Sequence, residues 1–491
     1  MSAQLNVMNR SLSYFRQLTL GNINPYVMQV EDLTLTLLTK ASEIKKELQQ
    51  GVKKPFTKVV ECHWGDAQAL GQKPITFLRQ VMAVCTFPEL QHDASIPEDA
   101  KHRAKKILES CDGGSIGAYN HSQSLTYIQR KLAKYIERRD GGVASHPHHI
   151  YIMNGTSTCI TIMMNMLITG EGACRTGLLT PSPQFPSFAS IISLLDGVHV
   201  KYLLNEERGW TLEIPELQRA LTQARTHCNP LVLSVINPHN PTGHVMTRKT
   251  IEDVIKFAAK EKLFLLVDEV YQDNVYSEDC QFHSFKKVLF EMGPEYSGTV
   301  ELASLSSMSK GYMGECGIRS SFMEVVNLDS EVQTVLDCIS SISDCSIYAQ
   351  IVIDVFADPP QPGDPSYQLF IMEKEAIRRR QADHALLIET ILNSEVGIYC
   401  CPIQGGVFAY PRIHIPPKAL EAAQVLNQEA DVFYCTRLLE ETGILVLAGS
   451  YLSQRPGTHY IRLTLLLETE MLRKILRTIT QFHRRFTSAF S

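Results

Sequence analysis

The sequence predicts an α/β protein in which helices flank a large, mostly parallel sheet and a smaller α+β unit follows. Three observations lead to this prediction. The middle of the chain alternates short apolar or β-branched runs with roughly 10 to 20 residues of helix-like periodicity, which is typical of βαβ units. The segment 367–394 is rich in Glu, Lys, Arg, Gln, Ala and Leu and indicates one long helix. Beyond it, short strands and helices indicate a second unit.

Seven apolar or β-branched runs are expected to form the strands of the large sheet. Between most of them lie helical patterns such as residues 249–261. The runs are 150–153, 177–180, 198–204, 231–236, 263–267, 300–305 and 321–326.

The smaller unit is expected after an exposed loop, Pro359-Pro-Gln-Pro-Gly-Asp-Pro365. It is predicted to contain strands within 396–412, 443–446 and 459–465 and helices at 419–442 and 468–487. We therefore expect an N-terminal arm and leading helix at 1–50, and an N-terminal part of the small domain at 51–100. A large α/β domain would occupy 101–375, and the rest of the small domain 376–491.

The composition favours a small-molecule partner. The chain has 491 residues, 44% hydrophobic and 20% charged, and a net charge of −5 without long runs of either sign. This disfavours nucleic acid and membrane surfaces as partners. Thirteen cysteines without a CxxC pair indicate reduced thiols. The longest apolar run, 159–169, is well short of the roughly 20 residues that span a membrane.

Polar residues follow several predicted strands, where open α/β sheets bind ligands. Asn154-Gly-Thr-Ser-Thr158 opens a helix, either as a phosphate site or as an ordinary N-cap. In Asn237-Pro-His-Asn-Pro-Thr-Gly243 the prolines and glycine make a rigid turn, from which Asn240 is placed to donate to a ligand. Asp268 ends an apolar strand and requires a cationic partner or hydrogen bonds there.

Lys310 lies among small residues in Ser307-Met-Ser-Lys-Gly-Tyr-Met-Gly-Glu-Cys-Gly-Ile-Arg319. A lysine amine with an arginine nine positions later suits an aldehyde cofactor that carries a phosphate. His146-Pro-His-His149 lacks the spacing of a metal site on a helix, so no metal is expected.

Four motifs in this order resemble the fold-type-I pyridoxal 5′-phosphate aminotransferases: Gly155-Thr-Ser157, Asn237 to Gly243, Asp268-Glu-Val-Tyr271 and Ser307-Met-Ser-Lys310. Further segments resemble the alanine aminotransferases of that family, and the similarity runs from about Leu18 to Phe486. These segments are 65–80, 117–119, 135–142, 268–276, 281–287 and 310–317.

The resemblance implies pyridoxal 5′-phosphate as the cofactor and gives each residue a role. Lys310 would bind the cofactor aldehyde and later move a proton at the substrate Cα, and Asp268 would keep the ring nitrogen protonated. Asn240 and Tyr271 would bind the ring oxygen. The other contacts would be Thr156, Ser157, Ser307 and Arg319 on the phosphate, Tyr119 on the phosphate from a neighbouring subunit, Phe185 on the ring face, Arg462 on the substrate carboxylate, and Gly65 beside the substrate.

The implied reaction is reversible ping-pong transfer of an amino group between L-alanine and 2-oxoglutarate, in a homodimer with its site at the subunit interface. The resemblance begins close to the first residue, which favours the cytoplasm over the mitochondrial matrix. Arg10 and Arg16, with no acidic residue before Glu31, weakly resemble a transit peptide, but a simple arm is preferred.

Several positions depart from the family pattern. Phe185 stands for a tyrosine, Thr158 for an aspartate and Gln129 for an arginine. Serines at 124, 320 and 321 stand for glycines and would crowd the backbone if φ were positive there. His63-Trp64 and Ala448-Gly-Ser-Tyr451 also differ. Two alternatives therefore stay open: a catalytically impaired or non-enzymatic paralogue on the same scaffold, and a pyridoxal-phosphate enzyme for another amino acid.

Overall fold

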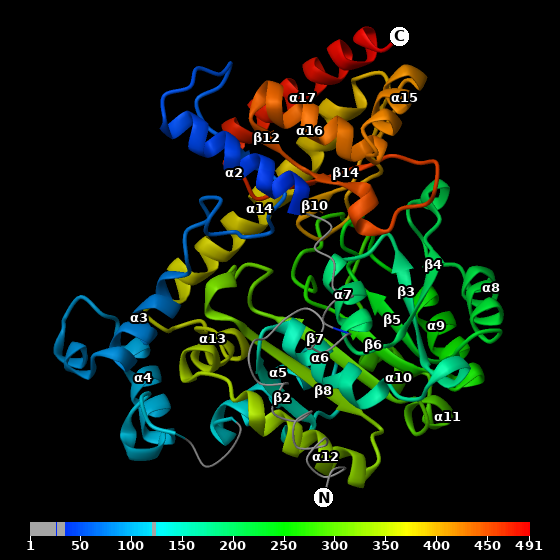
Figure 1. Ribbon diagram of the computed structural model, residues 1–491. Coiled ribbons are helices and arrows are strands. Elements are labelled where there is room, and N and C mark those ends of the chain that lie inside the picture. The colour runs from blue at the N-terminus through cyan, green and yellow to red at the C-terminus, as the bar shows by residue number, and fades with distance from the viewer. Residues whose placement is uncertain (1–25, 27–34, 120–123) are drawn as a thin grey trace, which may run out of the picture.

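A computed structural model describes Tyr26, residues 35–119 and residues 124–491 of the chain (Figure 1). Most of the expected N-terminal arm, including Arg10 and Arg16, lies outside the described residues. The chain is built around a seven-stranded sheet with helices on both faces. A smaller assembly of helices and short strands lies above this large unit in Figure 1. The predicted α/β fold class is therefore confirmed.

The central sheet has the strand order β2-β8-β7-β6-β5-β3-β4. All pairings among β4, β3, β5, β6 and β7 are parallel, and β8 runs antiparallel to both of its neighbours. Every strand predicted for the large sheet is present, and its ends differ from the prediction by at most two residues. The strands are β2 (Ile150–Asn154), β3 (Thr176–Ser182), β4 (Val198–Leu203), β5 (Asn229–Ile236), β6 (Phe264–Asp268), β7 (Leu302–Ser307) and β8 (Ser320–Val326).

Alternate residues of each buried strand supply two different cores, since successive side chains point to opposite faces of a sheet. In β6, Phe264 and Leu266 pack in the core that contains helix α6, whereas Leu265 and Val267 pack in the core that contains α9. The helices around the sheet are α3 (Thr76–Thr86), α4 (Glu98–Ser110), α5 (Thr126–Arg139), α6 (Thr156–Leu167), α7 (Pro186–Leu194), α8 (Ile214–Ala224), α9 (Arg248–Glu261), α10 (Phe285–Glu291), α11 (Pro294–Ser297), α12 (Ser330–Ser340) and α13 (Ile347–Ala357).

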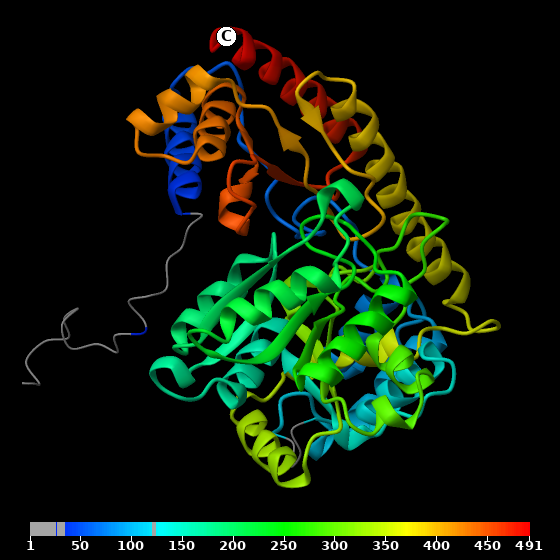
Figure 2. The same ribbon diagram turned by 90° about the vertical axis from the view of Figure 1, so that its right-hand side faces the viewer.

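The small unit combines the C-terminal part of the chain with an early segment. Strand β1 (Val60–Glu61) pairs in parallel with β12 (Ile444–Leu445), so residues near the start of the chain belong to this unit. The long helix α14 (Tyr367–Asn393) runs from the large sheet to this unit (Figure 2). Its other elements are α2 (Leu35–Gln49), β9 (Ile398–Tyr399), β10 (Phe408–Ala409), β11 (Arg412–Ile413), α15 (Pro417–Val425), α16 (Ala430–Thr442), β13 (Leu447–Ala448), β14 (Ile461–Thr464) and α17 (Thr469–Ala489).

One helix prediction was wrong in detail. Residues 419–442 were expected to form one helix, but they form the end of α15 and all of α16. Asn427, between the two, has a left-handed backbone conformation with φ +51°, which an α-helix cannot continue through. The chain turns there, and α16 begins after Glu429. The boundaries of the two predicted domains stay a prediction.

Among the described residues, no single helix is both long and apolar enough to cross a bilayer. The nearest approach is a sharply bent pair, Ser330–Ser343 with Ile347–Ala357, which reaches the required length only when the two are taken together. The second member of this pair is largely buried in the protein core.

Candidate active site

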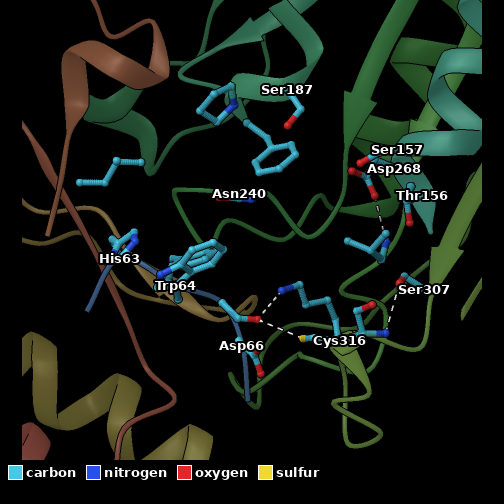
Figure 3. A pocket seen from close by; sticks show the side chains of 18 of the residues that line it. His63, Trp64, Asp66, Thr156, Ser157, Ser187, Asn240, Asp268, Ser307 and Cys316 are labelled. Carbon is cyan, nitrogen blue, oxygen red and sulfur yellow. Dashed lines mark hydrogen bonds between the residues drawn. The ribbon is translucent and has the colours of Figure 1, made fainter. Parts of the chain in front are cut away.

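A cavity of about 910 Å³ lies between the sheet and the small unit. One wall, the sheet wall, consists of residues that follow strands of the large sheet. The facing wall, the small-unit wall, consists mainly of residues of the small unit and of the loop after β1 (Figure 3). The sheet wall contains Thr156, Ser157, Phe185, Asn240, Asp268, Tyr271, Ser307, Lys310 and Arg319; the small-unit wall contains His63, Trp64, Gly65, Phe408, Tyr451 and Arg462.

Eleven of the twelve residues predicted for the site line this cavity; the exception is Tyr119. Its side chain is 96% exposed and is not part of the lining. Residues 120–123, which follow it, lie outside the described residues. A role for Tyr119 in this site therefore depends on a second subunit, and it stays a prediction.

The start of α6 forms an anion cradle with Arg319. The helix begins at Thr156, so its first backbone N–H groups have no partner within the helix and point out of its N-terminus. Gly155 has φ +89°, and a Cβ there would lie 2.3 Å from Nη2 of Arg319. Glycine is therefore required for the guanidinium to approach the turn. The buried Oγ1 of Thr156 has no hydrogen-bond partner among the described residues, as expected of a group that awaits a ligand.

Asp268 ends β6 on the α6 side of the sheet and faces the cavity, near Thr156 and Ser157 (Figure 3). Its carboxylate accepts the backbone N–H of Val270 at 3.2 Å and is 8% exposed. Burial raises the pKa of Asp268 to about 6, against the lowering effects of that hydrogen bond and of the Lys310 ammonium. A cation in the cavity would lower this pKa and stabilise the charged carboxylate.

The next residue, Glu269, points to the opposite face of the sheet. It accepts hydrogen bonds from the backbone of Phe285 at 2.8 Å and from Ser304. Its side chain is fully enclosed, and burial raises its pKa to about 7. Period-two alternation along the chain thus sends only one of two adjacent carboxylates to the cavity.

Lys310 reaches the small-unit wall and donates a hydrogen bond to the carbonyl of Gly65. Burial lowers the pKa of Lys310, which favours the neutral amine. A Cβ at Gly65 would lie 2.8 Å from Nζ of Lys310 and 2.8 Å from the ring of Phe408. Gly65 therefore keeps open the space around the amine.

Arg462, on β14, is a buried cation with no carboxylate partner in the part of the chain that the structure describes. Its guanidinium donates to the carbonyl of His63 at 3.0 Å and to Oδ1 of Asn240 at 3.3 Å, and it lies 4.0 Å from the ring centre of Phe408. Its Nε has no partner among the described residues. Burial lowers the pKa of Arg462 to about 10, so it still carries its charge at neutral pH. Such a group is suited to bind a carboxylate in two-point contact.

Three comparisons with known proteins bear on this arrangement. Residues 83–479 match the family described as aminotransferase class I and II. Alanine aminotransferase 2 of Xenopus tropicalis is 53% identical over 97% of this chain and 91% of its own length, and alanine aminotransferase 1 of Homo sapiens is 49% identical over 96% of each.

The chain belongs to the class I and II aminotransferases. Alanine aminotransferase from Pyrococcus furiosus, a solved structure with 18% sequence identity, matches with a TM-score of 0.74 over 94% of this chain and 100% of that one. This likeness supports the fold-type-I architecture. Enzymes of this family use pyridoxal phosphate and act on amino acids and 2-oxo acids.

The residues of this aminotransferase fit that cofactor. A phosphate matches the cradle formed by the start of α6 and Arg319, because the cradle supplies an unpartnered hydroxyl, free N–H groups and a guanidinium. A protonated ring nitrogen matches Asp268, which is buried and which no cation within residues 35–119 or 124–491 contacts directly. Asn240 and Tyr271, whose Nδ2 and hydroxyl oxygen lie 3.4 Å apart, present further polar atoms to the same cavity.

The serines that stand for family glycines do not strain the backbone of the aminotransferase. None of Ser124, Ser320 and Ser321 has positive φ; the left-handed residue there is Arg319, with φ +62°. Ser320 and Ser321 begin β8, where the hydroxyl of Ser320 donates to the carbonyl of Ala349 at 2.6 Å and that of Ser321 to the carbonyl of Met153 at 3.0 Å. The side chains therefore contribute hydrogen bonds within the large unit.

Sequence reasoning missed several residues of the cavity. Phe408 lies under the Arg462 guanidinium, and Cys316 donates to the carbonyl of Ser309 at 3.1 Å beside Lys310. Cys316 lay within a quoted motif, but as a lone cysteine it carried no signal of its own. Phe408 lies in a two-residue strand without a motif. The only local signal for the Ala448–Tyr451 loop was its departure from the family pattern.

Proposed function

We propose that this aminotransferase transfers an amino group reversibly between L-alanine and 2-oxoglutarate, in two half-reactions on pyridoxal 5′-phosphate. The observation that carries the proposal is the convergence of Asp268, Lys310 and Arg462 on one cavity. Asp268 is a buried acid that suits the ring nitrogen, and Lys310 is an amine of lowered pKa that suits the proton transfer. Arg462 is a buried cation that suits the substrate carboxylate. The identity of the relatives supports the choice of substrates.

The bound cofactor supplies an aldehyde that reacts with amines and an electron-poor ring that stabilises negative charge at the substrate Cα. In the proposal, Arg319 and the hydroxyls of Thr156, Ser157 and Ser307 hold the phosphate. Phe185, which lines the cavity at the start of α7, covers one ring face.

Lys310 is the proposed base and acid of the reaction. Burial lowers the pKa of Lys310, so its neutral amine can accept the proton from the substrate Cα. The resulting ammonium can then donate that proton to the cofactor carbon that carries the amino group. The carbonyl of Gly65 accepts from Nζ and so orients the amine. Lys310 is also the residue proposed to hold the cofactor aldehyde between turnovers.

Arg462 is proposed to bind the substrate α-carboxylate. No acidic side chain of the described residues pairs with it, and the ring of Phe408 covers its guanidinium. Asn240 accepts from Arg462 and so ties the carboxylate site to the ring-oxygen site. Water is displaced from a buried charge pair of this kind, which strengthens the interaction.

The homodimer, the cytoplasmic location and the domain boundaries are also proposals. The support for the dimer is the family resemblance at Tyr119, whose side chain is 96% exposed and so is available for contact with a second subunit. A sedimentation measurement that finds only monomers under assay conditions would contradict this part.

Of the two alternatives, the impaired paralogue loses its main motive, since the serines at the glycine positions lie in ordinary backbone conformations. Action on another amino acid keeps its motive, because Trp64 and Tyr451 both line the cavity.

The test is an assay of the purified holoenzyme with L-alanine and 2-oxoglutarate, together with the visible cofactor band before and after addition of each amino acid. The proposal expects pyruvate formation and conversion of the band by both L-alanine and L-glutamate. A bound cofactor whose band no amino acid converts would indicate the impaired paralogue. Faster conversion by another small amino acid would indicate the other alternative.

A further inference from the structure

The cavity must hold two different substrate side chains if the proposed function is right, and the inference below rests on that function. Alanine presents a methyl group, whereas 2-oxoglutarate and glutamate present a second carboxylate. A carboxylate that leaves water needs hydrogen-bond donors or a cation in the site. Apart from histidine, the basic side chains among the described lining residues are Lys310, Arg319 and Arg462. Each of these is already required at the reacting carbon, the phosphate or the α-carboxylate.

His63 lies on the small-unit wall and has a buried polar side chain to which no role has yet been given. The ring is 6% exposed, and neither Nδ1 nor Nε2 has a hydrogen-bond partner among the described residues. The backbone carbonyl of His63 accepts a hydrogen bond from Arg462 at 3.0 Å. The His63 ring therefore belongs to a residue that directly contacts the proposed α-carboxylate site. Buried polar groups in folded proteins are normally paired, which indicates that a ligand completes this one.

Trp64 extends the same surface. Its ring centre lies 5.0 Å from that of His63, and the side chain is 52% exposed although it lines the cavity. The two side chains lie across the cavity from Thr156, Ser157 and Ser307 (Figure 3). This is the end at which the substrate side chain would lie, since the phosphate occupies the other end.

We propose that His63, with Trp64 beside it, forms the subsite that binds the distal carboxylate of the dicarboxylic substrate. One imidazole N–H and the indole N–H donate to that carboxylate. With alanine bound, the same wall faces a methyl group, and a neutral ring tolerates this better than a buried fixed cation would.

The charges around His63 are consistent with a neutral donor. Burial lowers its pKa to about 4; Glu61 acts in the opposite direction, and Arg462 and Lys45 lower the pKa further. The imidazole is therefore uncharged at neutral pH and keeps one N–H. Asp66, also in the lining, receives the backbone N–H of Ala69 at 3.1 Å.

The experiment compares a dicarboxylic acid with a monocarboxylic acid of similar length. Glutarate and butyrate are titrated calorimetrically into the holoenzyme, and the half-reactions with L-glutamate and L-alanine are followed by the cofactor band. His63→Phe, which keeps a ring without donors, should weaken glutarate binding about 10-fold or more and raise the KM for glutamate, while butyrate and alanine change less than about twofold. Trp64→Phe should act in the same direction by a smaller factor.

His63→Gln retains an amide donor and should recover most of the affinity for glutarate. His102→Phe, at an exposed position of α4, is the control for the substitution itself and should leave both acids unchanged. Equal weakening of both acids by His63→Phe, or no change in either, would overturn the subsite. Failure of the wild-type enzyme to use alanine would instead contradict the proposed function, and the comparison of the two acids would still decide the subsite.

Discussion

The two walls of the cavity are built in different ways. The sheet wall is made of short motifs that directly follow strands β2, β5, β6 and β7. Each motif is therefore contiguous in sequence with the strand that positions it. The small-unit wall is assembled from His63 to Gly65, Phe408, Tyr451 and Arg462, which lie as much as 399 residues apart in the sequence. We infer that the sheet wall serves steps common to all substrates. The small-unit wall combines one group that every substrate uses, Arg462, with the side chains that distinguish substrates.

The largest expected effect is on the sheet wall. Lys310→Ala should lower the rate of both half-reactions by about 10⁴-fold, because the proton at Cα loses its acceptor. Single-turnover measurements with L-alanine and with L-glutamate check this, and the loss should be equal for the two. Lys249→Ala, an exposed residue of α9, is the control and should leave both rates unchanged.

Asp268→Asn should lower both half-reactions by about 10²- to 10³-fold, because an amide does not stabilise a positive ring nitrogen. The pH dependence follows from its pKa of about 6, which burial raises. The carboxylate is ionised above that pH and protonated below it, so cofactor affinity of the apoprotein should fall as the pH decreases through about 6. Asp268→Asn should lack this decrease; a parallel decrease in the variant would assign the titration to another group.

Arg462→Lys tests the part of the small-unit wall that every substrate uses. A lysine ammonium cannot make the two-point contact with a carboxylate, so kcat/KM should fall by about 30-fold or more. Because alanine and glutamate share the α-carboxylate, both should be affected alike. A loss confined to one substrate would mean that Arg462 reads the side chain instead, and the comparison of the walls would need revision.

Thr156→Val should weaken cofactor binding about fivefold, from the loss of one hydrogen bond to the phosphate at the start of α6. Equilibrium titration of the apoprotein with pyridoxal 5′-phosphate checks this. Thr161→Val is the matched control, because the hydroxyl of Thr161 bonds to the carbonyl of Ser157 on the exposed side of the same helix. Equal effects of the two substitutions would point to the helix itself.

The smallest expected effect lies behind the sheet wall. Ser320→Ala removes the donor to the Ala349 carbonyl and should lower the free energy of unfolding by about 1 kcal/mol, with activity within about twofold. Urea unfolding and the coupled assay measure the two quantities. A large gain in activity would show that the serine had impaired the enzyme after all.

Much of the sheet wall could be predicted from the sequence because its information is local. A strand pattern followed by Gly155-Thr-Ser157, or by Asp268, specifies both the element and the side chain at its end. The predicted strand boundaries were correct within two residues for the same reason. The break between α15 and α16 at Asn427 was missed, because an apolar and charged composition continues across it.

The sequence by itself determined the family, the order of the motifs along the chain and the reactive side chains that they carry. It could do so because hydrophobic periodicity and residue type are local properties. Only the tertiary structure decided that Ser320 and Ser321 lie in an unstrained strand, and that Phe408 and His63 lie beside Arg462. These facts depend on backbone angles and on contacts between distant segments. Such contacts are set by the packing of the two units against each other, which no local pattern records.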